Sequence, residues 1–323
     1  MSELCISAVS VRNGKIDKIY TEGPCDSSTL FQAASISKFV FTAALLRFLE
    51  ERDISLDTDI VPLTEGFTLL TPEGKTAKAT IRSLHTHTAG VSASGFIGYP
   101  YPAPLPSTLE ILNGEGPCST RKFVQDTEPG HWRYTGGGFM ILQLFAEQQT
   151  GLVFEDFMQQ YLFRPLGMTS STFSTDAVPV AGIPYYEKPS PYGYYFMPES
   201  SAAGLVTTSY DLAQFGIHLQ NILKGGSGIV SCDTAKEMTR PQCPDRFLME
   251  DSRECMTGLG CYLKTIDGTA YFGHCGDNVG FRSIADFSLD GTHGACILIN
   301  SDGPDDENRL FRLEDQLLRE ARE

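Results

Sequence analysis

The sequence contains no run of about 18 apolar residues, which excludes the usual pattern of a membrane-spanning helix. It also has no basic start followed by a long apolar stretch, so we expect no secretory signal. None of its nine cysteines belongs to a C-x-x-C pair, and their odd number fits neither a disulfide framework nor a zinc clip. These absences predict reduced thiols, a cytoplasmic location and no metal cofactor.

Positive charge is also scarce, because 25 Lys and Arg residues stand against 40 Asp and Glu residues. The formal net charge of −15 repels phosphate backbones, so we expect no nucleic-acid partner. Because no long apolar run is present, we expect no membrane partner either. No repeat of 20–50 residues is visible, which excludes solenoids and propellers. The chain has 323 residues, of which 41% are hydrophobic, and this balance is typical of a soluble globular protein with a sizeable core. The sequence leaves the oligomeric state open.

Hydrophobic periodicity and turn residues predict strands near both ends of the chain and helices between them. The predicted strands are 5–11, 15–20, 259–265, 270–274, 281–289 and 295–300, with a turn at Asn13-Gly14. The predicted helices are 37–51, 138–150 ended by Gly151, 154–163 ended by Pro165, 210–224 capped by Ser209, and about 305–322.

This distribution predicts an α+β fold in which one antiparallel sheet is built from both chain ends and flanked by helices. A mainly helical region is inserted in the middle. We expect a single domain over residues 1–323, with a sheet part at 1–52 plus 205–323 and a helical part at 53–204.

Two segments, 92–129 and 183–200, resist assignment to helix or strand and are rich in aromatic residues. Loops of this length in a compact domain are usually functional or disordered, and aromatic side chains argue against disorder. Two interpretations remain open: the tyrosines of these loops line a cleft, or they pack the loops against the helical region. The tyrosines concerned are Tyr99, Tyr101, Tyr192, Tyr194 and Tyr195.

The first candidate for chemistry is the S-x-x-K sequence formed by Ser35 and Lys38 at the start of the first long helix. A serine hydroxyl becomes a good nucleophile only when a base takes its proton. One helical turn puts both side chains on the same face, and the positive end of the helix dipole is expected to lower the lysine pKa. Apolar flanks on both sides would bury the lysine stem. Alone, S-x-x-K also fits a helix start with serine caps and a solvated lysine.

Two further motifs are weaker when each stands alone. Tyr134, in Tyr134-Thr135-Gly136, could relay a proton, or it could simply pack in the core before a helix. His274-Cys275-Gly276 follows a predicted strand, and we expect it to end an edge strand and offer backbone N–H groups as an oxyanion hole. A plain exit from strand to loop is the other interpretation of that motif.

Together, the order of these motifs resembles the serine β-lactamase and penicillin-binding protein superfamily, in particular the class C β-lactamase and family VIII esterase branch. The resemblance extends over about residues 29–301, through blocks such as LFQAASISKFVFTAALLRFLEE, TIRSLHTHTAGVS, EPGHWRYTGGGFMILQLFAEQQTG and FGHCGDNVGFRSI. It implies a serine β-lactamase-like fold, a single catalytic domain, an acyl-enzyme mechanism and no organic cofactor.

Carried over by position, the resemblance implies that Ser35 is acylated, that Lys38 is its base and that Tyr134 relays the proton. It implies an oxyanion hole made of the backbone N–H groups of Ser35 and Asp277. The implied substrate-binding residues are His274, Cys275, Gly276, Gly136, Tyr99 and Tyr194, and we expect Cys275 to lie near the cleft. The block containing His85 and His87 implies a structural loop.

The sequence departs from the branch at two positions. Gly136 stands where its lactamases usually carry the asparagine of Y-x-N, and His274 replaces the lysine of K-T-G. Both changes remove contacts to an anionic β-lactam, so we expect a carboxylesterase that acts on neutral esters. The alternatives are a β-lactamase, a D-amino-acid peptidase or amidase, an acyltransferase that uses the same acyl-enzyme, and, least favoured, a non-catalytic binding protein. The expected partner is a small-molecule ester or amide.

Overall fold

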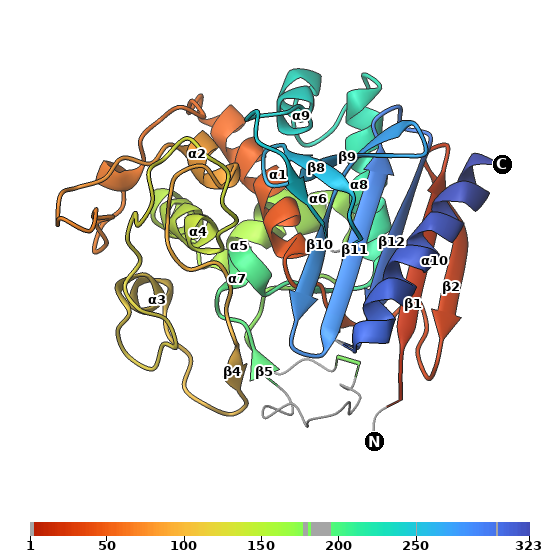
Figure 1. The fold of residues 1–323 in the computed structure, drawn as a ribbon, viewed down its shortest axis with the longest axis horizontal. Helices are drawn as coiled ribbons and strands as arrows, with labels where there is room; N and C mark the ends of the chain where they lie inside the picture. Colours follow the sequence, from red (N-terminus) through yellow and green to blue (C-terminus); the bar gives the residue numbers. More distant parts are fainter. Residues whose placement is uncertain (1–2, 177–179, 182–194, 250, 302) are drawn as a thin grey trace.

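The computed structural model describes residues 3–176, 180–181, 195–249, 251–301 and 303–323. Its main feature is an eight-stranded antiparallel sheet, in which strands from both ends of the chain pair side by side (Figure 1). In sheet order the strands are β2 (Lys15–Glu22), β1 (Ile6–Arg12), β12 (His293–Ile299), β11 (Phe281–Ser288), β10 (Thr269–Asn278), β9 (Tyr262–Ile266), β8 (Glu254–Thr257) and β7 (Phe247–Leu248). The predicted α+β fold is therefore confirmed.

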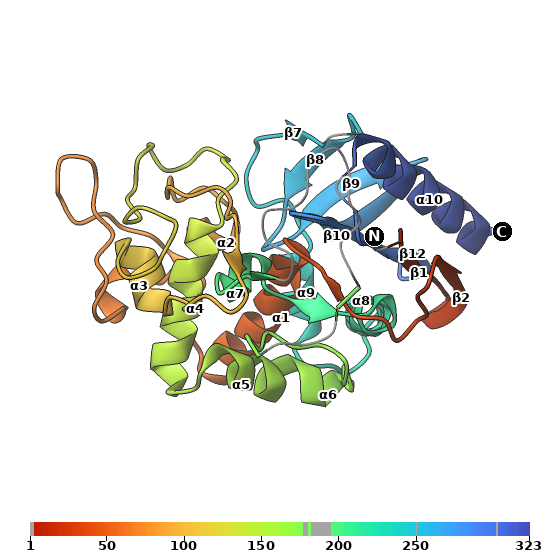
Figure 2. The same ribbon diagram turned by 90° about the horizontal axis from the view of Figure 1, so that it is seen from below.

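Helices cover both faces of the sheet. Helix α10 (Pro304–Arg322) packs on one face and helix α8 (Ser209–Leu223) on the other (Figure 2). Successive strand residues point to opposite faces, so Ala8 belongs to the core beneath α10 while Val9 belongs to the larger core on the α8 side. In α10, acidic residues occupy the first turn and basic residues the last, which suits the helix dipole.

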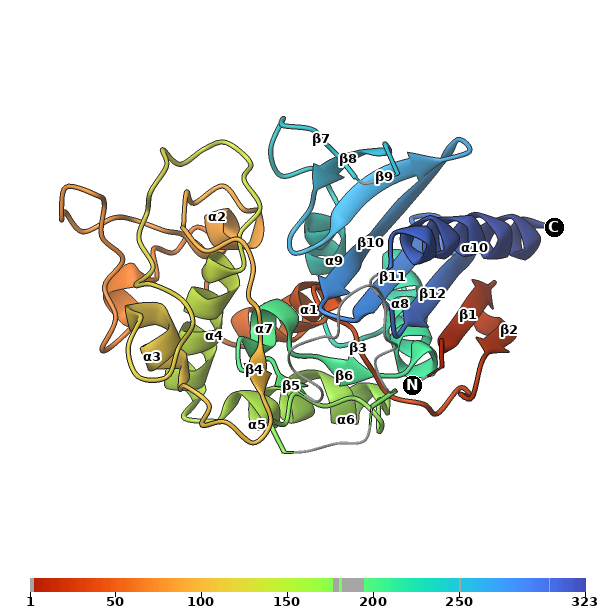
Figure 3. The same cartoon turned by 60° about the horizontal axis from the view of Figure 1, so that its bottom comes forward.

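Helix α1 (Ile36–Glu51) lies between the sheet and the helical part of the chain (Figures 1 and 3). It is buried on nearly every side, which explains its apolar sequence. The other helical segments are η1 (Val61–Leu63), α2 (Ile81–His85), α3 (Thr108–Asn113), α4 (Gly137–Thr150), α5 (Phe154–Met158), the π-helical turn η2 (Gln159–Phe163), α6 (Arg164–Leu166), α7 (Ser200–Ala203) and α9 (Cys232–Met238). Two small sheets pair β3 (Phe31–Gln32) with β6 (Val206–Thr207) and β4 (Tyr99–Pro100) with β5 (Tyr195–Phe196).

Several predicted boundaries are wrong for identifiable reasons. Pro165 does not end its helix, because it occupies the first turn of α6 after a π-helical turn, and the helix ends at Gly167 with φ 67°. The cap of α8 is Thr208 rather than Ser209, since its hydroxyl accepts a hydrogen bond from the backbone N–H of Asp211 at 3.1 Å.

The segment 92–129 is not all loop, because it contains α3. Ser107 and Glu110 form a capping box at its start, with each side chain bonded to the backbone of the other residue. The S-x-x-E pattern was visible in the sequence. The sheet also extends to β8 and β7, two short strands that the sequence patterns missed, and β9 begins three residues after its predicted start.

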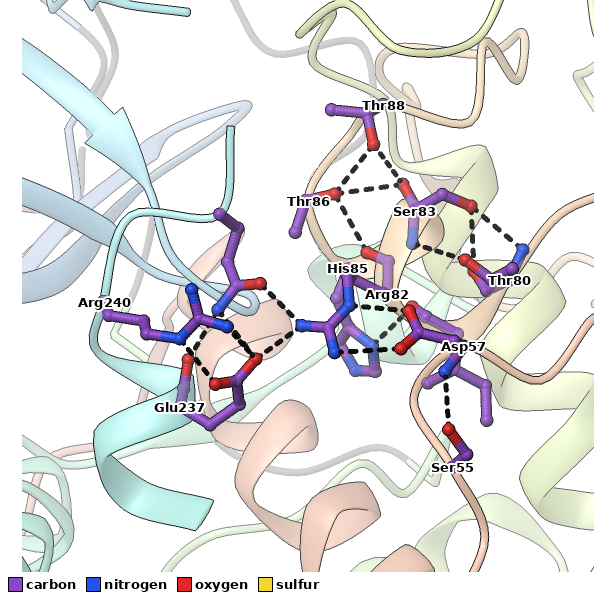
Figure 4. Close-up of polar contacts among 12 residues, drawn as sticks. Ser55, Asp57, Thr80, Arg82, Ser83, His85, Thr86, Thr88, Glu237 and Arg240 are labelled. Atoms are coloured by element: carbon purple, nitrogen blue, oxygen red, sulfur yellow. Dashed lines mark hydrogen bonds and ion pairs between the residues drawn. The ribbon is translucent and has the colours of Figure 1, made fainter. Parts of the chain in front are cut away.

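Arg82 of α2 ties the helical part to the segment around α9 (Figure 4). Its guanidinium pairs with Asp57 on one side and with Glu237 and Gln242 on the other. Glu237 also pairs with Arg240. No helix within the described ranges has both the length and the apolarity needed to cross a membrane.

Candidate active site

Ser35 lies at the turn that leads from β3 into α1. The residue before it, Ala34, has φ 48°, in the left-handed region that few non-glycine residues adopt, and Ser35 itself is the N-cap of the helix. Lys38 follows one helical turn later, so its Nζ lies 3.0 Å from Ser35 Oγ. The geometry predicted for S-x-x-K is therefore present.

Lys38 is 2% exposed, and its Nζ also donates a hydrogen bond to the carbonyl oxygen of Ala202 at 2.6 Å. Burial lowers the pKa of Lys38 from 10.5 to about 7. Removal from water disfavours the charged form, and this is the main cause, whereas the sequence argument attributed the lowering to the helix dipole. A lysine with this pKa is partly neutral near pH 7 and can accept a proton.

Tyr134 completes a three-residue cluster, because its hydroxyl donates a hydrogen bond to Ser35 Oγ at 2.7 Å. The tyrosine ring also lies 4.9 Å from Lys38 Nζ. His87 holds the segment that carries Tyr134: its carbonyl accepts from Arg133 N at 2.9 Å, and its Nδ1 accepts from Thr135 N at 3.2 Å. Burial keeps the pKa of His87 well below 6.5, so the ring is neutral and serves as a positioning group.

His85 is also buried and bonds through Nδ1 to the carbonyl of Ile81. Within the described ranges no group of three or more histidine, cysteine or acidic side chains is arranged to hold a metal ion. The structural role expected for the block containing His85 and His87 agrees with these contacts.

The strand β10 brings the third motif to the nucleophile, and here the predicted boundary needs correction. His274-Cys275-Gly276 does not follow the strand but lies within it, since β10 continues to Asn278. β10 is also not an edge strand, because β9 and β11 flank it, although its pairing with β9 ends at Gly273. A Cβ on Gly276 would lie 2.8 Å from Ser35 N and 2.4 Å from Ala33 O, so only glycine permits this approach.

Of the residues predicted to bind substrate, His274 does not reach the cavity. It is 1% exposed, and its ring stacks on Tyr262 with centroids 4.2 Å apart. Burial lowers the pKa of His274 to about 3, so it carries no positive charge at neutral pH. By contrast, Cys275, Gly276 and Asp277 all line the cavity.

Gly136 is also set back from the cavity. A Cβ at this position would lie 2.5 Å from Cε2 of Phe96, so the phenyl ring fills the space where a Y-x-N asparagine would begin. Phe96 itself lines the cavity. Position 136 therefore carries no side-chain amide, and the Phe96 ring occupies the space that such an amide would need.

The described loop tyrosines do not line the cavity. Tyr99 is buried, and its hydroxyl accepts a hydrogen bond from Ser119 N at 2.8 Å. Tyr195 is buried and donates to the carbonyl of Val279, while Tyr101 is half exposed and contacts Phe196. Tyr99 and Tyr195 are thus packed away from the cavity, although Tyr195 contacts the turn between β10 and β11 rather than the helical region. Tyr192 and Tyr194 lie outside the described residues.

The cavity above Ser35 has a volume of about 370 Å³. Many of its walls are apolar. They include Phe96, Trp132, Phe247, Leu248, Met249, Tyr262, Leu310 and Phe311, which come from distant parts of the chain. Phe96 belongs to the aromatic segment 92–129, for which a cleft-lining role was one of the two interpretations. The other wall residues were not predicted, because only the tertiary fold brings them together.

The sequence also missed the charged group at one end of the cavity. Arg282 of β11 faces Asp277 in the register of β10 and β11, and its Nε lies 3.9 Å from the Asp277 carboxylate. Its Nη1 lies 3.4 Å from Glu307 of α10. All three residues line the cavity. Two carboxylates therefore outnumber the single guanidinium.

Comparisons with known proteins show a family and several similar folds. The profile of the family described as Beta-lactamase matches residues 4–319. Penicillin-binding protein 4* of Bacillus subtilis (strain 168) is 24% identical over 241 residues, which cover 72% of this chain and 49% of that protein. The matched regions span less than half of the length of the curated relatives.

Two solved structures are similar in fold. D-amino acid amidase from Ochrobactrum anthropi SV3, complexed with D-phenylalanine, has a TM-score of 0.77 at 18% identity, over 98% of this chain and 93% of that one. The octameric penicillin-binding protein homologue from Pyrococcus abyssi has a TM-score of 0.75 at 21% identity, over 96% and 72%. At these identities the likeness concerns the fold alone.

Proposed function

The chain belongs to the Beta-lactamase family of the serine β-lactamase and penicillin-binding protein superfamily, and on that premise we propose that it is a serine hydrolase that cleaves carboxylic esters through an acyl-enzyme on Ser35. One observation carries the proposal. Ser35 Oγ lies within hydrogen-bond distance of both Lys38 Nζ and Tyr134 Oη, and burial gives that lysine a pKa of about 7.

In this proposal neutral Lys38 takes the proton of Ser35 as Oγ attacks the ester carbonyl carbon. The backbone N–H groups of Ser35 and Asp277 stabilise the oxyanion, and the close fit of Gly276 against Ser35 N supports that arrangement. The bond to the alkoxy group then breaks, and Tyr134 supplies the proton that the alcohol carries away. Tyr134 then takes a proton from water as the water oxygen attacks the acyl carbon, Lys38 returns its proton to Ser35 Oγ, and the carboxylic acid leaves.

The preference for esters over β-lactams rests on two residues, His274 of β10 and Gly136 at the start of α4. His274 is neutral and buried, and Gly136 is covered by Phe96, so neither offers a charged or amide contact to an anionic ring system. An ester without a carboxylate needs neither contact. Charge in the cavity adds to this, because the two carboxylates of Asp277 and Glu307 outnumber the guanidinium of Arg282.

That excess of carboxylate also favours a second candidate function, an amidase or peptidase whose substrate carries a free amino group. An ammonium group close to Asp277 and Glu307 would gain a favourable electrostatic interaction. The similarity in fold to D-amino acid amidase makes amino-acid amides reasonable compounds to test. An acyltransferase would share the same acyl-enzyme and replace water by an alcohol or amine.

Labelling with a fluorophosphonate tests the nucleophile directly. We expect the probe to modify the peptide that contains Ser35, and Ser35→Ala to lose both labelling and activity. Labelling of another residue, or normal turnover by Ser35→Ala, would overturn the mechanism. Parallel assays of p-nitrophenyl esters, nitrocefin and D-alanyl amides then rank the substrate classes. Product identification with an added alcohol separates hydrolysis from acyl transfer.

A further inference from the structure

Three aromatic side chains form one continuous wall of the cavity, and we define Trp132, Phe247 and Tyr262 as the aromatic wall. The rings of Trp132 and Phe247 stack with centroids 4.0 Å apart and planes at 1°. Phe247 meets Tyr262 edge to face at 4.9 Å. All three line the same cavity as Ser35, Lys38 and Tyr134.

The aromatic wall joins two parts of the chain that are distant in sequence. Trp132 lies in the segment before α4, two residues ahead of Tyr134, whereas Phe247 belongs to the short edge strand β7. A hydrogen bond from Trp132 N to the Asp245 carboxylate at 2.7 Å anchors the two segments to each other. This hydrogen bond holds the segment of Trp132 against the segment of Phe247, in a cavity that Tyr134 also lines.

Other apolar side chains line the same cavity as the aromatic wall. They are Phe311 and Leu310 from α10 and Phe96, among others, and apart from Lys38 the charged residues of the lining are Asp277, Arg282 and Glu307. Flat aromatic faces attract other rings through stacked or edge-to-face contacts, and they gain further from removal of apolar surface from water. A cavity with such a lining binds an apolar ring more tightly than a short alkyl group.

We infer that the aromatic wall selects substrates whose acyl or alcohol portion carries an aromatic ring, and that this ring lies against Trp132 and Phe247 while the ester carbonyl reaches Ser35. The inference rests on the proposed function and names its substrate class. It differs from the expectation drawn from the loop tyrosines, because the residues that line the cavity come from other segments.

Matched esters test the inference. Hydrolysis of methyl phenylacetate is compared with that of methyl acetate for the acyl portion, and benzyl acetate with ethyl acetate for the alcohol portion, by acid release at pH 8. We expect kcat/KM for the ring-bearing ester of at least one pair to fall tenfold or more in Trp132→Ala and in Phe247→Ala. The ring-free esters should change less than threefold, and Trp132→Phe should retain most of the preference.

Tyr101→Ala serves as the control variant, since Tyr101 is half exposed and does not line the cavity. It should leave every ester unchanged. An equal loss for ring-bearing and ring-free esters would indicate a merely structural role for the aromatic wall and overturn the inference. An unchanged ratio for both pairs would overturn it too. Melting curves show whether each variant is folded, and Phe247→Ala provides the test if Trp132→Ala fails to fold.

A second readout is independent of catalysis, because Trp132 is the only tryptophan in the chain. In Ser35→Ala, methyl phenylacetate or benzyl acetate should quench or shift the Trp132 fluorescence in a saturable way, while methyl acetate should not. Absence of a saturable change with both ring-bearing esters would overturn the inference. A saturable change without hydrolysis of any ester by the unmodified protein would instead keep the aromatic wall and reject the proposed function.

Discussion

In the proposed mechanism Lys38 accepts a proton from Ser35, which requires the neutral form of the lysine, and burial favours that form. Because burial lowers its pKa to about 7, the neutral fraction falls about tenfold for each pH unit below 7. We therefore expect kcat/KM for an uncharged ester to rise with pH up to about 7 and then to level off. Initial rates from pH 5 to 9 measure this profile. A rate that stays level down to pH 5 would contradict the role of Lys38 as base.

Lys38 and Tyr134 share one hydrogen-bond acceptor, Ser35 Oγ, so their effects on catalysis should not add. We expect Lys38→Ala and Tyr134→Phe each to lower kcat by about 10²- to 10⁴-fold. The double variant should be little slower than the slower single variant. Steady-state kinetics of the four proteins measures the coupling. Losses that multiply fully would indicate two independent contributions.

Gly136 and Phe96 form a second coupled pair. An asparagine at position 136 would restore the Y-x-N sequence, but its Cβ would meet the Phe96 ring at 2.5 Å. We expect Gly136→Asn to reduce the free energy of unfolding by about 1–3 kcal/mol, the usual cost of overpacking. In a Phe96→Ala background the added cost should largely disappear. Urea unfolding of the unmodified protein, both single variants and the double variant measures this difference. An equal cost of Gly136→Asn with Phe96 present and with Phe96→Ala would contradict the steric explanation.

At the scale of elements, sequence patterns predicted a helix or strand correctly where neighbouring residues alone determine its structure. The hairpin at Asn13-Gly14 and the amphipathic helix α10 were predicted within a few residues. Prediction failed where distant residues decide. β10 continues past His274 because β11 pairs with it as far as Asn278, and that pairing is invisible in a single strand sequence. Pro165 is tolerated because a π-helical turn precedes it.

At this scale we predict the contribution of Arg82 to stability. Its ion pairs with Asp57 and Glu237, here called the Arg82 clamp, connect α2 to α9 (Figure 4). Arg82→Met removes pairs with Asp57 and Glu237, and it should lower the free energy of unfolding by about 1 kcal/mol, since the pairs are partly exposed. The matched control Arg240→Met removes only one exposed pair with Glu237 and should cost less. Urea unfolding at pH 7 measures both variants, and an equal or smaller cost for Arg82→Met would contradict the clamp.

The same clamp predicts a pH dependence. Pairing with Arg240 and Arg82 lowers the pKa of Glu237 to about 2, and Arg82 also lowers the pKa of Asp57. A carboxylate with a lowered folded pKa contributes stability above its unfolded pKa, near 4, and loses it as the pH falls through the folded value. The difference in stability between the unmodified protein and Arg82→Met should therefore be full at pH 7 and shrink from about pH 4 towards pH 2. A difference that grows over this interval would contradict the assignment.

At the scale of the whole molecule, the site lies where the sheet and the helical part meet. The proximity of Ser35 and Lys38 could be predicted because the S-x-x-K spacing is local, and Tyr134 joined the candidate site because its motif resembles a known block. The aromatic wall could not be found in this way, since Trp132 and Phe247 touch only after the chain ends have formed one sheet. The neutral state of His274 likewise depends on burial, which local sequence does not fix.

The last prediction concerns the charge of the substrate, and it depends on both the net charge of the chain and the charges in the cavity. The net charge of −15 and the carboxylates of Asp277 and Glu307 disfavour an anionic ligand, and Arg282 is already paired with both. A cephalosporin carries a carboxylate, and it would find neither a free cation at His274 nor an amide at position 136. The loss of one charged contact and one hydrogen bond costs several kcal/mol, or about two decades in specificity. We expect kcat/KM at pH 7–8 to be at least tenfold higher for the best p-nitrophenyl ester than for nitrocefin. A nitrocefin value equal to or above that of the ester would favour the β-lactamase alternative.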